Sequence, residues 1–414
     1  MNEPELVRLL GAILALLLAS QVVGAVFQHL KQPRVVGEIL GGLLLGPTVL
    51  GALAPALYVG LFEPSPAHQQ ILGFVFWLGL ILLMFCSGLE TPTVKSGAEW
   101  RSVGWLTATG TLLPLLAGWG LAVGFDFSPY FGPQATPVSF GLVLALAIAV
   151  TSIPVISKIF LDLGLAGTPF ARVVLSAAMI EDIVLWVLLS LALGMAAAAT
   201  GSPDQLALGV MVPVVYFAGG LLLGPRLYDA IARRMPLGHF HEGVPAVVVL
   251  LAAVLAAAAL SVNPIFGAFL AGRIVAQAAT IPDASRQAIK GFSLAFFVPV
   301  YFASVGLKLN LLHHFPLLVF LGLLLAACTI KAASAFLGGL LAGQPRAQSL
   351  HLAVAMNARG GPGIVLATVT LEAGLINEGF YAVLIMLALV TSQLAGWWLE
   401  RVLRQAPEEL ELAA

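Results

Sequence analysis

The chain has 414 residues, of which 60% are hydrophobic and 9% are charged. A soluble globular domain carries about 25% charged residues, so the composition excludes that class and predicts an all-α polytopic membrane protein. The formal net charge of −1 gives no indication of a nucleic-acid partner.

Thirteen stretches are apolar and long enough to cross a bilayer as helices. In chain order they are about 6–26, 35–50, 70–89, 102–124, 139–161, 172–197, 205–225, 244–260, 264–280, 290–307, 315–341, 348–371 and 379–399. Some of these stretches are short or closely spaced, so twelve spans remain an alternative. Basic residues gather in alternate loops, which predicts an outside N-terminus, a cytoplasmic C-terminus and an odd number of spans.

The chain therefore reads as a single membrane domain, 1–414, with a bacterial plasma membrane as the default location. Its hydrophilic loops are short, and the stretch after Trp398 is a short acidic tail. We expect no C-terminal nucleotide-binding domain. Metal-protease, zinc and nucleotide-binding motifs are missing, so we expect neither an enzyme nor a resident cofactor.

Five ionisable residues remain at membrane depth: Glu38, Glu181, Asp182, Lys331 and Arg359. Each costs at least about 2.5–3.5 kcal/mol in a helix centre, which is hard to explain by chance. For Glu38 and Arg359, a structural ion pair that holds helices together and a functional role explain the sequence equally well. The adjacent acids differ, because neighbouring residues on a helix point about 100° apart. One can pair with a base while the other faces a water-filled cavity and holds a proton or a metal cation, as in a cation/proton exchanger.

Two spans are interrupted near their middle. The fifth contains Thr151–Pro154, including Ser152, and the twelfth contains Asn357–Gly363 with three glycines, a proline and Arg359. Irregular backbone at membrane depth is tolerated where it is buried in protein or lines a cavity. Paired interruptions in the two halves of a chain indicate a transporter binding site. The glycine-rich segments GEILGG (37–42) and GAFLAG (267–272) also lie seven spans apart, as inverted repeats would.

Several stretches together resemble the second monovalent cation:proton antiporter superfamily, the sodium/proton exchangers and Kef-type transporters. They occur in family order and cover nearly the whole membrane region. They are QPRVVGEILGGLLLGPTVLG (32–51), LGLILLMFCSGLE (78–90), AVTSIPVISKIFLDLGL (149–165), ARVVLSAAMIEDIVLW (171–186), VNPIFGAFLAG (262–272), AFFVPVYFASVGLKLNL (295–311), and the Lys331 helix followed by NARGGPG (357–363).

The resemblance implies thirteen helices in two inverted repeats with crossed discontinuous helices. Core helices would cover about 102–197 and 315–399, and helices of a homodimer interface about 6–89 and 205–307. The core would slide against the interface helices and expose its ion site alternately to each side.

The resemblance also suggests roles for single residues. Asp182 occupies the position of the cation- and proton-binding aspartate, and Lys331 that of a lysine facing the acidic pair. Thr151 and Ser152 lie where oxygen ligands are expected. Many relatives have aspartate or asparagine at the position of Glu181, so the stoichiometry stays open.

The expected function is secondary active exchange of a monovalent cation, Na+ first and K+ second, for H+. The transported cation would bind at Asp182, and Arg359 beside Asn357 would hold the crossing and neutralise Glu181 or Glu38. Expected partners are the two ions, membrane lipid and a second copy of the chain. The alternative is a sodium-coupled solute symporter with a similar core.

Overall fold

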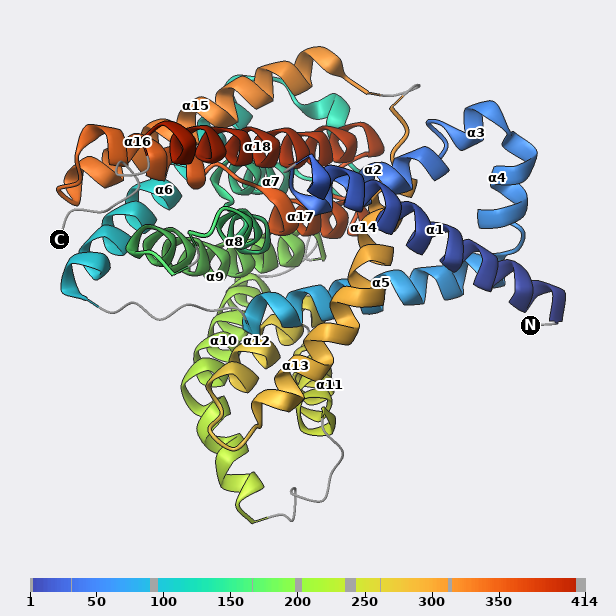
Figure 1. Cartoon of the computed structure of the whole chain (residues 1–414), viewed down its shortest axis with the longest axis horizontal. Coiled ribbons are helices and arrows are strands. Elements are labelled where there is room, and N and C mark those ends of the chain that lie inside the picture. The colour runs from blue at the N-terminus through green and yellow to red at the C-terminus, as the bar shows by residue number, and fades with distance from the viewer. Residues whose placement is uncertain are drawn as a thin grey trace. The chain divides into compact units, whose positions relative to one another are not determined.

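The computed structural model describes residues 3–30, 32–89, 96–165, 167–197, 203–234, 243–260, 262–311 and 315–406. Helices dominate these ranges (Figure 1), and no β-strand occurs among them beyond one isolated bridge between Phe131 and Ile376. The predicted all-α membrane fold is confirmed.

Ten helical segments in the described residues are long and apolar enough to cross a membrane. Three further apolar helices are shorter, namely α7 (Pro137–Ala149), α11 (Val244–Ala259) and α12 (Pro264–Gln277). The short helices coincide with predicted spans five, eight and nine, so the count of thirteen stays a prediction.

The chain divides into two compact units, each described here by itself. Unit 1 comprises Met1–Val26, Gly37–Thr91 and Ala207–Leu309, and unit 2 comprises Phe27–Val36, Pro92–Leu206 and Asn310–Ala414. The helices of unit 1 are α1 (Glu3–His29, to Val26), α2 (Arg34–Leu45, from Gly37), α3 (Leu50–Leu53), α4 (Pro55–Phe62), α5 (Pro66–Leu89), α10 (Pro203–Ala232, from Ala207), α11, α12, α13 (Asp283–Phe292), a π-helical turn (Ser293–Phe297) and α14 (Val298–Leu307).

Unit 2 contains the remaining helices. They are α6 (Gly97–Gly124), α7, α8 (Ile153–Asp162), α9 (Pro169–Ala197), α15 (Leu317–Leu341), α16 (Arg346–Ala355), α17 (Gly360–Glu372) and α18 (Glu378–Gln405). α18 extends six residues beyond its predicted end at 399, through an arginine-containing turn that the hydropathy criterion excluded.

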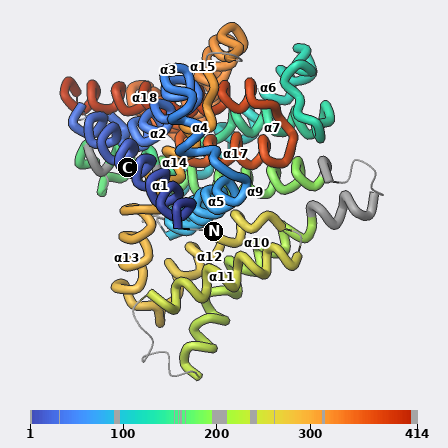
Figure 2. Tube along the Cα trace, turned by 90° about the vertical axis from the view of Figure 1, so that its right-hand side faces the viewer, coloured from blue at the N-terminus to red at the C-terminus, as the bar shows by residue number. Residues whose placement is uncertain are grey.

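Glycines allow very close helix packing in unit 1, where α11 and α12 lie side by side (Figure 2). A Cβ atom on Gly42 of α2 would lie 1.8 Å from the Ala303 carbonyl oxygen of α14, and one on Gly306 of α14 would lie 1.9 Å from the Ile39 oxygen of α2. A Cβ on Gly272 of α12 would lie 2.1 Å from the Phe85 oxygen of α5. The glycine-rich segment of α2 thus packs on α14, and the similar segment of α12 packs on α5. An internal repeat predicts such equivalent contacts in its two halves.

We predict that Gly306→Ala destabilises the protein, because the added methyl group meets backbone that cannot move aside. Overpacking of this kind costs about 1–3 kcal/mol or more. The thermal melting temperature of the detergent-purified protein should fall. Gly73→Ala on α5 is the matched control, since a Cβ there meets nothing within 4 Å. Equal melting temperatures for the two variants would contradict the packing described.

Both predicted interruptions occur in unit 2. α7 ends at Ala149 and α8 begins at Ile153, while α16 ends at Ala355 and α17 begins at Gly360. The first break was predicted at Thr151–Pro154, but it lies slightly earlier. Pro154 is the second residue of α8, where its missing N–H costs no helical hydrogen bond. The proline therefore starts the second half-helix and does not itself form the break.

The loops beside the two interrupted helices are joined at one end of unit 2. The Asn377 side-chain amide donates to the Pro129 oxygen at 2.8 Å, and Gln134 N donates to the Gly374 oxygen at 2.8 Å. Aromatic rings pack across the same place, from Phe127, Tyr130, Phe131, Phe140 and Phe380. Asn377 also caps α18 by accepting from Phe380 N at 2.9 Å. The loop before α7 and the loop after α17 are thus held together.

Candidate functional site

The two helix interruptions of unit 2 contact each other directly. Ser152 N donates to the Ala358 oxygen at 2.6 Å, and the Thr151 hydroxyl donates to the Met356 oxygen at 2.7 Å. The Ser152 hydroxyl oxygen accepts from Gly361 N at 3.0 Å. Unwound backbone at membrane depth needs such partners, since no water is available to satisfy it. The crossing therefore satisfies the orphan groups of each break with those of the other.

Arg359 lies at the start of α17 and is only 1% exposed. Its guanidinium donates to the Ala147 oxygen at 3.2 Å, to the Ile148 oxygen at 3.1 Å and to the Ala327 oxygen at 2.7 Å. Carbonyls 147 and 148 belong to the last turn of α7, where they lack helical partners and carry partial negative charge. The expected partners of Arg359 were the carboxylates of Glu181 or Glu38, but the acceptors of these three bonds are backbone carbonyls.

Lys331, on α15, is fully buried and forms an ion pair with Glu181 of α9. Its ammonium nitrogen lies 2.9 Å from each carboxylate oxygen of Glu181. It also donates to the Ala149 oxygen at 2.5 Å and to the Gly110 oxygen at 2.8 Å. Ala149 is the last residue of α7, so Lys331 and Arg359 together occupy three successive carbonyls at that helix end.

Asp182 follows Glu181 on α9 and is 1% exposed. Neither of its carboxylate oxygens has a hydrogen-bond partner among the residues that the structure describes. An isolated ionised carboxylate is very costly in such an interior, so the group must hold a proton or a cation. Glu181 thus pairs with the lysine, whereas the expected ligand role of Asp182 stays a prediction.

The other predicted site residues lie at the crossing. The Asn357 amide nitrogen donates to the Cys328 oxygen at 3.3 Å, and its side-chain oxygen accepts from Arg359. The Ser152 oxygen also accepts from Val155 N at 3.4 Å, so two N–H groups already occupy it. The Thr151 hydroxyl donates to the Met356 oxygen and also interacts with the Glu181 side chain; as a donor to Met356 it keeps its oxygen lone pairs.

Two residues of α6 were missed by sequence reasoning, namely Gly110 and Thr111. A Cβ atom on Gly110 would lie 2.8 Å from Oε1 of Glu181, so a side chain there would displace the carboxylate from its present position. Thr111 lines a small cavity together with Glu181. The only signal in the sequence was a small and a hydroxylated residue in the middle of an apolar span, which is common in membrane helices.

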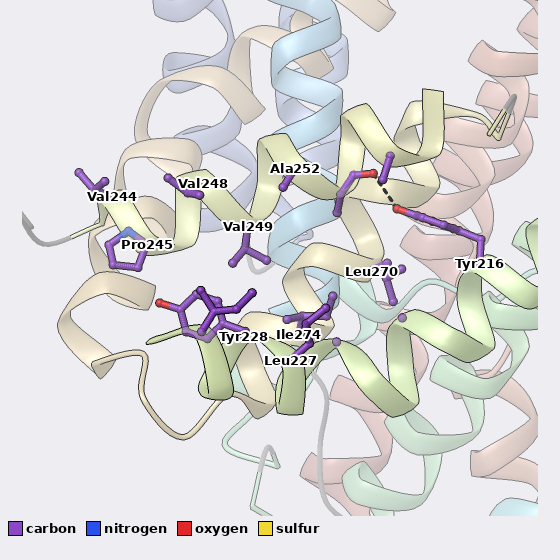
Figure 3. Close-up of a pocket in the computed structure, with 15 residues that line it drawn as sticks. Tyr216, Leu227, Tyr228, Val244, Pro245, Val248, Val249, Ala252, Leu270 and Ile274 are labelled. Atoms are coloured by element: carbon purple, nitrogen blue, oxygen red, sulfur yellow. Dashed lines mark hydrogen bonds between the residues drawn. The ribbon is translucent and has the colours of Figure 1, made fainter. Parts of the chain in front are cut away.

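Glu38, the fifth ionisable residue predicted at membrane depth, lies on α2 in unit 1 and is 6% exposed. Unit 1 also contains an apolar cavity of about 440 Å³ lined by residues of α10, α11 and α12 (Figure 3). At one end of it the Tyr216 hydroxyl donates to the Ala253 oxygen at 2.7 Å. Its lining contains no acid, so it offers a monovalent cation no anionic ligand.

Crossed, interrupted helices around a buried carboxylate define the class of ion-coupled membrane transporters. The match to the family model "Sodium/hydrogen exchanger, transmembrane" covers residues 13–405, and the chain belongs to this family. The family is a family of transporters.

Named proteins and one solved structure agree with this assignment. Cation/H(+) antiporter 17 of Arabidopsis thaliana is 28% identical over 94% of this chain and 48% of its own length, so the chain spans about half of that relative. Na(+)/H(+) antiporter NhaS4 of Synechocystis is 26% identical over 95% of this chain and 96% of its own. The sodium proton antiporter MjNhaP1 of Methanocaldococcus jannaschii shares the fold, with a TM-score of 0.66, 18% identity and 97% of each chain covered.

We predict that Lys331→Met destabilises the protein strongly, because Glu181 would be left buried without its partner. Breaking a buried ion pair costs about 3–5 kcal/mol, whereas replacing both partners by apolar residues is often neutral. The melting temperature should fall for Lys331→Met and recover in part in Lys331→Met/Glu181→Leu, where the Ala149 and Gly110 oxygens still lack their donor. A double variant no more stable than the single one would contradict the pairing.

Proposed function

We propose that the protein is a secondary active antiporter that exchanges a monovalent cation for protons by alternating access. The observation that carries the proposal is the Asp182 carboxylate, buried and without a hydrogen-bond partner among the described residues. Beside it, the Lys331–Glu181 pair and Arg359 already neutralise the helix end of the crossing. A lone carboxylate in that setting accepts either of two small cations, a proton or a metal ion.

Competition for Asp182 couples the two fluxes. A proton bound to the carboxylate leaves a neutral acid, and an arriving metal cation displaces it because both need the same oxygens. Oxygen dipoles complete the shell of a dehydrated monovalent cation in membrane proteins. The Thr151 hydroxyl is the favoured second ligand, since Ser152 already accepts two N–H bonds.

Sodium is the first candidate and potassium the second. The Synechocystis relative, which matches this chain almost end to end, is named a Na(+)/H(+) antiporter. A glutamate at 181 in place of aspartate or asparagine adds a methylene group to the lysine-paired acid. Both oxygens of Glu181 accept from Lys331, so the carboxylate offered to the transported cation is that of Asp182.

The symporter alternative finds little support in the cavities at the crossing. Glu181 lines one cavity and Arg359 lines another, and each has a volume of about 10 Å³. Sites for organic solutes occupy roughly 300–1,000 Å³. Solute-dependent sodium uptake into proteoliposomes would nevertheless favour the symporter over the exchanger.

The transport core is assigned to unit 2, because both interruptions lie in it, together with four of the five ionisable residues predicted at membrane depth. Unit 1 is assigned to the scaffold and to a homodimer interface, in the plasma membrane of a bacterium with the N-terminus outside. Neither enzymatic activity nor a resident cofactor belongs to this scheme. Native mass spectrometry of the detergent-purified protein tests the dimer.

We predict that Asp182→Asn abolishes exchange while the protein still folds, because asparagine cannot alternate between a neutral and an anionic form. Proton movement is measured in proteoliposomes with an imposed pH gradient, after addition of sodium, potassium, lithium or choline. The wild type should dissipate the gradient with a metal cation and not with choline.

The matched control is Asp126→Asn, the same substitution at an exposed carboxylate whose partner is Ser128 N at 2.9 Å. This variant should exchange ions like the wild type. Cation-driven proton movement that persists in Asp182→Asn would remove Asp182 from the mechanism. A wild type that moves no protons with any cation would overturn the exchanger itself.

A further inference from the structure

Thr111 of α6 has a buried hydroxyl that no described residue satisfies. The residue is 7% exposed, and its oxygen has no hydrogen-bond partner in the described structure. Buried hydroxyls are nearly always hydrogen-bonded, to protein or to ordered water. The other two threonines of α6 differ from it. Thr109 bonds its own helix by donating to the Trp105 oxygen at 2.8 Å. The Thr107 hydroxyl also has no partner in the described structure, but Thr107 does not line the cavity beside Glu181.

A small cavity lies between Thr111 and Glu181. Apolar residues of α6, α7 and α9, together with Val150, line the rest of it. The volume of the cavity is about 10 Å³. A single buried water needs roughly 10–15 Å³ and polar groups in the lining, so the cavity is close to the size of one water.

Glu181 has room for another hydrogen bond on this side. Each of its oxygens accepts one bond from Lys331, at 2.9 Å, and Thr151 is a further side-chain partner. An ionised carboxylate has about four acceptor positions, so one remains. A water molecule in the cavity can therefore donate one hydrogen to Glu181 and exchange a second bond with the Thr111 hydroxyl.

We propose that one buried water molecule binds between the Thr111 hydroxyl and the Glu181 carboxylate, which makes Thr111 a positioning residue of the exchange site. Through this water, Thr111 holds the Glu181 carboxylate in its ionised, lysine-facing orientation while Asp182 changes its ligand. The kinetic part of this inference rests on the proposed antiport. The binding of the water does not.

The charged groups that face Glu181 come from several elements. They are Lys331 from α15, Arg359 at the start of α17 and Asp182 on its own helix. None of them is altered by a substitution at Thr111, so a changed pH response would be attributable to the hydroxyl and its water.

The first experiment compares Thr111→Val, which removes the hydroxyl at nearly constant shape, with Thr111→Ser, which keeps it. We expect the maximal exchange rate of Thr111→Val to fall about tenfold, the effect of losing one hydrogen bond to a charged group. The pH of half-maximal rate should move by about one unit toward higher pH, because the Glu181 carboxylate has lost the hydrogen bond from the water that favours its ionised form. Thr111→Ser should stay within about twofold of the wild type.

Thr109→Val is the matched control, because that hydroxyl bonds only its own helix. It should leave both the rate and the pH profile unchanged. An unshifted pH profile in Thr111→Val, or the same loss in Thr111→Ser, would overturn the positioning role.

An experimental density map separates this inference from the antiport proposal. The wild type should show a peak between Thr111 and Glu181 that disappears in Thr111→Val. Without such a peak in a map that resolves other buried waters, the inference is wrong even if the protein exchanges ions. With the peak but without exchange in the wild type, the antiport proposal fails and the water site stands.

Discussion

The structure of unit 2 depends on a helix that ends inside an apolar interior. The final carbonyls of α7 cannot reach water, and they carry the negative end of the helix dipole. Arg359 takes the oxygens of Ala147 and Ile148, and Lys331 takes that of Ala149. The two buried cations are therefore explained first by the broken helix and only then by the acids. In the opposing break, Thr151 donates to the Met356 oxygen and Ser152 N to the Ala358 oxygen, while Arg359 also donates to the Asn357 oxygen at 3.1 Å.

This constraint sets the roles of the two acids. The end of α7 holds Lys331 in place through the Ala149 oxygen. Glu181 of α9 reaches this ammonium group, and its carboxylate lies beside the backbone of Gly110. Residue 182 points about 100° away and cannot share the same ammonium group. Asp182 thus stays without a hydrogen-bond partner in the described structure, as a direct geometric consequence of the pairing beside it.

Sequence reasoning found the parts whose signal is local. Glycine, proline and polar residues within an apolar span indicate each helix break. Charged residues within such spans stand out because placing them in a membrane costs free energy. The partners were not predictable in the same way. Arg359 was expected to meet a carboxylate but bonds backbone carbonyls, because a helix end is a multi-residue acceptor that no single letter shows. Gly110 matters through the space that it leaves, which only the packed structure reveals.

The same physics explains why the crossing can serve a carrier and need not collapse into a static ion-pair cluster. The loops next to α7 and α17 are tied by Asn377 and an aromatic cluster, and the breaks are tied by backbone hydrogen bonds. These ties do not engage the Asp182 carboxylate, which has no hydrogen-bond partner in the described structure. In the proposed exchange, Asp182 can therefore change its ligand while Arg359 and Lys331 keep their bonds to the end of α7. The electrostatic cost of the broken helix is then met by groups that take no part in the exchange.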